Sequence, residues 1–144
     1  MTKTEQKKIN VKRRKKLLKL WSSEGRKEDQ CCYLCGTTDR LQAHHAWSKK
    51  MYPALRFDPH NRIIVCCSCH SFKGRSDRGS MHMSPEAVVN WALDNMLQYQ
   101  YLCDNKGNEI NLDDTAELDR IEQCILDDKP LWDQISSSPT DQIS

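Results

Sequence analysis

Residues 65–70 read VCCSCH, which places three cysteines and a histidine within six consecutive positions. A disulfide cluster, a metal site and chance could each explain this crowding. The chain has 144 residues and eight cysteines, a number compatible with a secreted disulfide scaffold. However, the basic start MTKTEQKKINVKRRKK (1–16) is not followed by the apolar run of a signal peptide. We therefore expect an intracellular, cytoplasmic protein with reduced thiols, and clustered reduced thiols favour metal binding.

Two pairs of cysteines share a gap of two residues, which lets both thiolates of a pair reach one ion. Two such pairs complete the tetrahedral all-thiolate site of a structural zinc. Cys31 and Cys67 leave other pairings open, but a one-residue gap from Cys67 to the next cysteine is strained for two ligands of one ion. The predicted ligands of the structural zinc are Cys32, Cys35, Cys66 and Cys69.

Charge is distributed unevenly along the chain. Residues 1–30 carry eleven Lys/Arg and four Asp/Glu, a net charge of +7, while residues 31–102 carry +3 and residues 103–144 carry −8. The basic front and middle favour a nucleic-acid partner, DNA above all. The acidic segment is interpreted as a solvated surface, a tether or a docking site for a protein partner. Because no run of about 18 apolar residues occurs, we expect no membrane partner.

Hydrophobic periodicity predicts an α+β fold in three regions. These are a basic N-terminal extension (1–30), a zinc-stapled domain with a following helix (31–102) and an acidic helical tail with a loose C-terminus (103–144). We expect disorder over residues 1–10 and a basic helix from residue 11. The other predicted elements are strands at 41–47 and 62–65, a long loop at 48–61, and helices at 85–98 and 113–128.

The histidines form a second pattern beside the cysteines. His44 and His45 are adjacent, and neighbouring residues of a strand point to opposite faces. One of them can therefore bind an ion while the other faces a different target. A zinc staple between the two cysteine pairs would bring His70 towards the first strand, so we expect His70 to lie near His44.

The order of these residues resembles a known family. The cysteine pairs, the two adjacent histidines, Asn61 and His70 follow one another as in the zinc-stapled HNH endonucleases, whose core is the ββα-metal fold. Asn61 precedes His70 by nine positions, as in that family. The resemblance covers about residues 31–75. More weakly, the segment LRFDPHN (55–61) is similar to phage HNH proteins, including the NinG recombination family.

The resemblance implies a metal-dependent DNA endonuclease that hydrolyses phosphodiester bonds. It makes His45 the general base, and it makes His44 and His70 ligands of one catalytic divalent cation (Mg²⁺, Mn²⁺ or another transition metal). Asn61 would pin the long loop and so orient His45. Neutral imidazole can take a proton from water near pH 7, and a cation can stabilise the charge on the leaving oxygen.

The third ligand of the catalytic cation is an open position. Many family members carry a ligand one helical turn after the final histidine, where this chain has Gly74. Some HNH proteins instead resemble this chain in having a histidine three residues before a proline, as His82 stands to Pro85. His82 is therefore a candidate third ligand, and a surface histidine is the other interpretation.

Several basic residues are candidate phosphate contacts that would not read sequence. The alternative for each is a solvated surface charge. They are Arg56 in the long loop and Lys12, Arg13, Arg14, Lys15 and Lys16 near the N-terminus.

A non-catalytic, zinc-dependent nucleic-acid-binding module is the alternative function, because one fold can serve either purpose. The presence of both His45 and Asn61 favours the enzyme, since a pure binding module needs neither. A structural zinc protein that docks a partner through its acidic segment would explain the tail but not the histidines.

Overall fold

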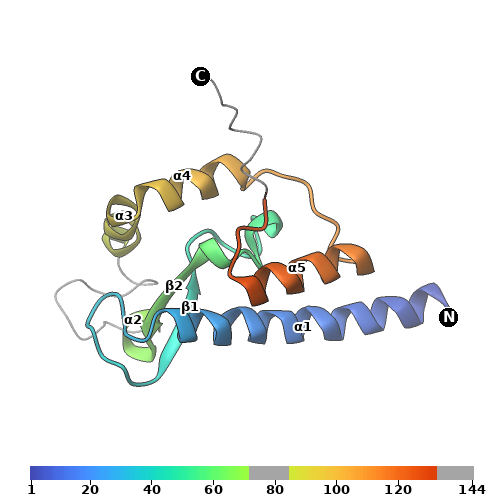
Figure 1. Cartoon of the computed structure of the whole chain (residues 1–144), viewed down its shortest axis with the longest axis horizontal. Coiled ribbons are helices and arrows are strands. Elements are labelled where there is room, and N and C mark those ends of the chain that lie inside the picture. Colours follow the sequence, from blue (N-terminus) through green and yellow to red (C-terminus); the bar gives the residue numbers. More distant parts are fainter. Residues whose placement is uncertain (72–84, 133–144) are drawn as a thin grey trace.

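The computed structural model of the chain describes residues 1–71 and 85–132. Within these residues, a two-stranded antiparallel sheet is surrounded by helices (Figure 1), which confirms the predicted α+β class. The predicted loose C-terminus lies outside the described residues. In chain order the elements are α1 (Lys3–Glu28), β1 (Leu41–His45), the 3₁₀ turns η1 (Pro53–Leu55) and η2 (Pro59–Asn61), β2 (Arg62–Cys66), α2 (Cys67–Ser71), α3 (Pro85–Asp94), α4 (Met96–Asn105) and α5 (Thr115–Asp127).

Helix α1 begins at Lys3, so the expectation of disorder over residues 1–10 is wrong. Thr2 and Glu5 form a capping box, in which each side chain accepts a hydrogen bond from the other residue's backbone N–H. Further along the helix, the buried Asn10 donates through Nδ2 to the carbonyl oxygen of Asp113 at 2.6 Å. The cap and this distant contact order the segment expected to be disordered.

The buried face of α1 packs against α5, which lies along it in Figure 1. Leu17 and Trp21 are four residues apart and are 2% and 1% exposed, so they form one apolar stripe of α1. Three fully buried residues of α5 complete this part of the core: Leu118, Ile121 and Ile125.

Ion pairs flank the contact between the basic and the acidic helix. The Arg13 guanidinium lies 2.5 Å from a carboxylate oxygen of Asp119 and 3.1 Å from one of Glu122. Arg14 lies 2.7 Å from Asp113, just before α5. Within the described residues, part of the acidic segment therefore docks on the chain's own basic helix.

The sheet pairs Leu41 with Cys66 at one end and His45 with Arg62 at the other, so both predicted strands are confirmed. All five residues of β2 are buried, and α2 follows β2 without an intervening loop. The resulting order of strand, strand and short helix brings the second cysteine pair and His70 back towards β1.

The helix expected over residues 85–98 is divided into α3 and α4 at Asn95. The backbone of Asn95 leaves the helical region, with φ −131° and ψ 51°, and its side chain donates to the carbonyl oxygen of Trp91 at 2.9 Å. This local hydrogen bond satisfies a terminal carbonyl of α3. Among the described residues, no helix is long and apolar enough to cross a membrane.

Arg62 fastens α1, β2 and the end of α5 together. Its guanidinium donates to the carbonyl oxygen of Trp21 and to the carboxylate of Asp128, both at 2.8 Å. Gly25 makes room for it, because a Cβ there would lie 2.8 Å from two atoms of the Arg62 side chain. The pKa of Arg62 is lowered by burial, an effect that Asp128 opposes.

Candidate functional site

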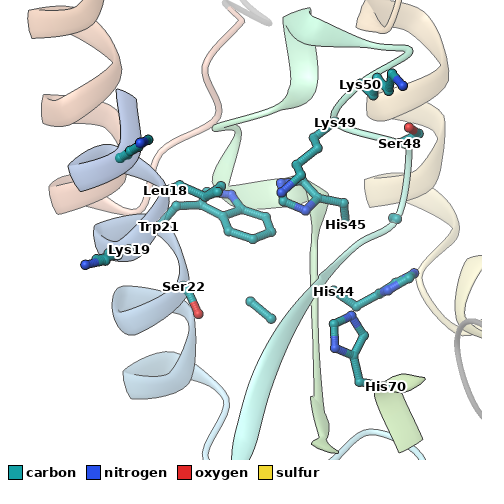
Figure 2. Close-up of a pocket in the computed structure, with 13 residues that line it drawn as sticks. Leu18, Lys19, Trp21, Ser22, His44, His45, Ser48, Lys49, Lys50 and His70 are labelled. Carbon is teal, nitrogen blue, oxygen red and sulfur yellow. The ribbon is translucent and has the colours of Figure 1, made fainter. Parts of the chain in front are cut away.

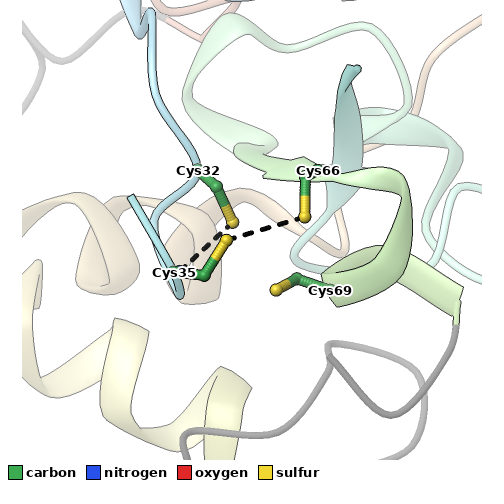
Figure 3. Close-up of side chains that lie close together, drawn as sticks. All are labelled: Cys32, Cys35, Cys66 and Cys69. Atoms are coloured by element: carbon green, nitrogen blue, oxygen red, sulfur yellow. Dashed lines mark hydrogen bonds between the residues drawn. The ribbon is translucent and has the colours of Figure 1, made fainter. Parts of the chain in front are cut away.

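Four cysteines meet where the loop after α1 approaches the end of β2 (Figure 3). Their sulfur atoms all lie within 4.8 Å of one another, and those of Cys35 and Cys66 are 3.7 Å apart. A zinc–sulfur bond of about 2.3 Å in a tetrahedral site places sulfurs roughly 3.8 Å apart, so this cluster fits one zinc ion. Its members are the predicted ligands Cys32, Cys35, Cys66 and Cys69.

The first cysteine pair has the tight turn that brings two sulfurs together. The backbone N–H of Cys35 donates to the sulfur of Cys32, and the N–H of Gly36 donates to the carbonyl oxygen of Cys32. Gly36 has a φ of +78°, a left-handed conformation that a residue with a Cβ rarely adopts. Cys31 is exposed and, like the half-buried Cys67, stands outside the cluster, so the structure supports the chosen set.

The Cys32 sulfur is prepared for ionisation. Burial opposes the thiolate, but backbone N–H groups of Cys35, Cys66 and Leu34 point at the sulfur. These N–H groups outweigh the effect of burial and lower the pKa of Cys32 to about 7. Because zinc binds the thiolate, this environment suits a metal ligand.

His44 of β1 and His70 of α2 also meet, as the sequence predicts (Figure 2). Their ring centroids lie 5.2 Å apart with an interplanar angle of 77°. A metal–nitrogen bond of about 2.0–2.1 Å would place two imidazole centroids on one ion roughly 5 Å apart. This pair therefore has the spacing of two ligands that share a cation.

Gln42 is a site residue that the sequence reasoning missed. Its Oε1 lies 2.7 Å from Nδ1 of His70, and an amide oxygen accepts. His70 therefore carries its proton on Nδ1 and presents Nε2 as the possible metal ligand. Gln42 and His44 point to the same side of β1 because they are two residues apart, and that spacing was the available signal.

His45 points to the other side of β1 and stacks on Trp21 of α1, with ring centroids 4.0 Å apart and 14° between the planes. Its Nε2 lies 2.9 Å from the carbonyl oxygen of Arg56. A carbonyl can only accept, so Nε2 carries the proton and Nδ1 keeps the lone pair. Burial is the main cause that lowers the pKa of His45 to about 4, the Arg56 carbonyl opposes the shift, and the charge of Lys49 adds to it.

Asn61 fixes the loop that supplies the Arg56 carbonyl. It is fully buried, and its Oδ1 accepts from the N–H of Trp47 at 2.8 Å. Its Nδ2 donates to the carbonyl oxygens of Trp47 and Leu55, at 3.0 and 3.1 Å. One side chain thus ties both ends of the loop after β1 together, and Arg56 directly follows one of its partners.

The histidines line a cavity of about 970 Å³ between α1, β1 and the loop after β1 (Figure 2). Lysines stand on both sides of it, and they are Lys15, Lys19, Lys49 and Lys50. No carboxylate is among the described lining residues. The cavity therefore combines imidazole nitrogens with a positive rim, an arrangement suited to an anionic ligand.

The six predicted phosphate contacts do not all face this cavity. Lys15 lines it, whereas Lys12 and Lys16 line a separate hollow that also contains Glu122. Arg13 and Arg14 are engaged by acidic residues of the C-terminal region, as described above. Arg56 is half-buried, its guanidinium lies 5.2 Å from the Phe57 ring centre, and burial lowers its pKa.

Gly74 and His82 lie outside the described residues, so the third-ligand prediction stays a prediction. Comparisons of the chain with family models, with curated proteins and with solved structures find no match. The case for a function therefore rests on the residues and their geometry.

Proposed function

We propose that this protein is a metal-dependent DNA endonuclease of the HNH type. The observation that carries the proposal is one arrangement. Two imidazoles stand at the spacing of shared metal ligands, a third imidazole lies at the adjacent position of β1, and all three line a cavity with a lysine rim. The order of β1, β2 and α2 supports the resemblance to the ββα-metal fold.

His45 has the properties of a general base in this proposal. The Arg56 carbonyl holds the proton on Nε2, so Nδ1 is the nitrogen that can accept a proton from a water molecule. The pKa of about 4 keeps the ring neutral at pH 7 and so able to accept a proton, and it lies below the value near 7 at which a general base works best. Stacking on Trp21 limits the orientations of the ring, and Asn61 holds the loop that carries the Arg56 carbonyl.

His44 and His70 would hold the catalytic cation, which when bound stabilises negative charge on the phosphate and the leaving oxygen. The hydrogen bond from His70 to Gln42 fixes which nitrogen of His70 faces the cation site. His82 would complete the ligand set. The four-cysteine cluster would hold the structural zinc, which ties α2, and with it His70, to the loop after α1.

The test is cleavage of supercoiled plasmid with and without Mg²⁺ or Mn²⁺ by the wild type and by His45→Ala. We expect cation-dependent nicking or linearisation by the wild type and a loss of roughly 10²–10⁴-fold in His45→Ala, the usual contribution of a general base. His60→Ala is the matched control, because His60 is a half-buried histidine that is not among the residues lining the cavity.

Two results would count against the enzyme. Wild-type rates in His45→Ala would remove His45 as the base. DNA binding without cleavage under every cation tried would favour the alternative, a non-catalytic zinc-dependent binding module.

A further inference from the structure

The lysine rim of the histidine cavity comes from two separate parts of the chain. Lys15 and Lys19 lie one turn apart on α1, and Lys49 and Lys50 follow β1 in the loop. All four are exposed, and Figure 2 shows Lys49 beside His45. The two lysine pairs therefore lie on either side of the histidines.

Part of the positive charge of α1 is neutralised by ion pairs, but these ion pairs lie outside the histidine cavity. Arg13 and Arg14 pair with carboxylates of the acidic region. None of the ion pairs between described residues involves the four lysines of the rim. The four rim charges therefore stay uncompensated beside the histidines, whereas two arginines of the basic run of α1 are neutralised by carboxylates.

The described lining offers little that could grip or read a base. Its one aromatic ring besides the histidines is Trp21, which is 1% exposed and already stacked on His45. Proteins that hold single strands use accessible aromatic rings to stack unpaired bases. The lining also has no described Arg, Asn or Gln, so the side chains there that can reach base edges are the lysines and two serines, Ser22 and Ser48. Most protein–DNA hydrogen bonds go to phosphate and sugar, and lysine is one of their main donors, so we interpret these lysines as phosphate contacts.

We infer that this cavity binds the sugar–phosphate backbone of double-stranded DNA with little sequence preference. Lys15 and Lys19 contact phosphates on one side of the bond to be cut, and Lys49 and Lys50 contact phosphates on the other. This inference rests on the proposed function for the identity of the ligand, but it concerns binding and is tested without cleavage.

The experiment uses the His45→Ala protein, so that bound DNA stays intact, in buffer without added divalent cation. Fluorescence anisotropy measures the affinity for a short labelled duplex, and for one of its strands alone, over a range of salt concentrations. Lys15→Ala/Lys19→Ala and Lys49→Ala/Lys50→Ala are each introduced into this background. Lys7→Ala/Lys8→Ala is the matched control, with the same change of charge on α1 but away from the cavity.

Each phosphate contact adds about 0.9 to the slope of log affinity against log salt on duplex DNA. We therefore expect each rim pair to weaken binding and to flatten the slope by about 1.8, while the control pair leaves the slope nearly unchanged. The His45→Ala protein with all its lysines intact should bind unrelated duplexes with similar affinity, and it should bind the duplex more tightly than the single strand.

Several results would overturn the inference. They are an unchanged slope in both rim pairs, an equal effect of the control pair, tighter binding of the single strand, or a strong preference for one duplex sequence. Loss of cleavage with this binding pattern intact would count against the proposed enzyme and leave the binding surface standing. Conversely, cleavage could survive all four lysine substitutions while the salt slope stays unchanged. That result would support the proposed endonuclease and would reject the role of the four lysines in DNA binding.

Discussion

The cysteine cluster takes Cys66 from β2, the histidine cavity takes His44 and His45 from β1, and both use a residue of α2, but the two sites differ in closure. The cluster has four sulfurs within 4.8 Å of one another, and three of its cysteines are buried. The cavity has two imidazoles at ligand spacing, a third beside them and lysines around the mouth. A metal with four protein ligands has no free position for a substrate, whereas a metal with fewer keeps one. The four-cysteine cluster therefore suits a structural metal, whereas the histidine cavity leaves room for a substrate.

The largest effect should come from removing one ligand of the four-cysteine cluster. Structural zinc contributes about 10–16 kcal/mol in zinc-finger peptides, which matches or exceeds the about 5–15 kcal/mol stability of a typical domain. We expect Cys66→Ser to lose zinc and to unfold the middle of the protein. Metal analysis and circular dichroism measure both effects.

Cys67→Ser is the control for that change, because Cys67 neighbours Cys66 but stands outside the cluster. It should keep one zinc per chain and the wild-type melting curve. A folded, zinc-free wild type would contradict the assignment of the four-cysteine cluster.

The next largest effect should come from Asn61, whose hydrogen bonds hold the loop after β1 beside the histidine cavity. Asn61→Ala leaves one buried and two partly buried backbone groups without their partner, and a buried group left so costs about 1–3 kcal/mol. We expect a loss of about 4 kcal/mol in the free energy of unfolding by urea. Asn95→Ala, which removes one bond from a half-buried asparagine, should cost far less. Equal losses would show that Asn61 has no special role in the loop.

The protonation of His45 in the histidine cavity should lower the free energy of unfolding, whereas the four-cysteine cluster contains no histidine. The pKa of His45 is 6.5 in an unfolded chain and about 4 in the fold, so the unfolded state takes up a proton first as the pH falls. Stability from the neutral ring is therefore complete above pH 6.5 and is lost as the pH falls from 6.5 through 4. At 1.36 kcal/mol per pKa unit, the full loss is about 3 kcal/mol.

Denaturant unfolding of the wild type and of His45→Gln, at pH 7 and at pH 4.5, measures this contribution. The wild type should lose more stability between the two pH values than the variant, since glutamine does not titrate. Acid release of zinc affects both proteins alike and cancels in the difference. Equal losses would show that burial does not lower the pKa of His45.

The smallest effect should come from the residue that orients a ligand of the open site. Gln42→Ala removes the acceptor for Nδ1–H of His70, and we expect the Mg²⁺ or Mn²⁺ concentration for half-maximal cleavage to rise about tenfold, or 1.4 kcal/mol. Gln42→Glu keeps an acceptor and should retain near wild-type cation affinity. An equal rise in both variants would remove Gln42 from this role.

His82→Ala makes the same measurement for the proposed third ligand. A rise of tenfold or more, with the zinc content unchanged, is expected if His82 binds the cation. An unchanged titration would leave the ligand set at His44 and His70.

The sequence alone determined the parts of this protein that depend on short spacing. The two-residue gaps identified the four cysteines, because a gap of two residues lets both thiolates of a pair reach one ion. The β-branched run before Cys66 identified β2, and the adjacent histidines on a strand separated His44 from His45. In each case the feature depends on residues close together in the chain, so it can be predicted from their order.

Only the tertiary structure decided how distant segments use their charges and rings. It placed the Trp21 ring against His45, the Arg56 carbonyl on that histidine and the acidic helix against Arg13. No periodicity records these contacts, because each joins residues far apart in the chain whose partner is fixed by packing of the whole core. The basic run of α1 is uniform in sequence, and its docking on α5 is what leaves Lys15 facing the histidines while the neighbouring arginines pair with carboxylates.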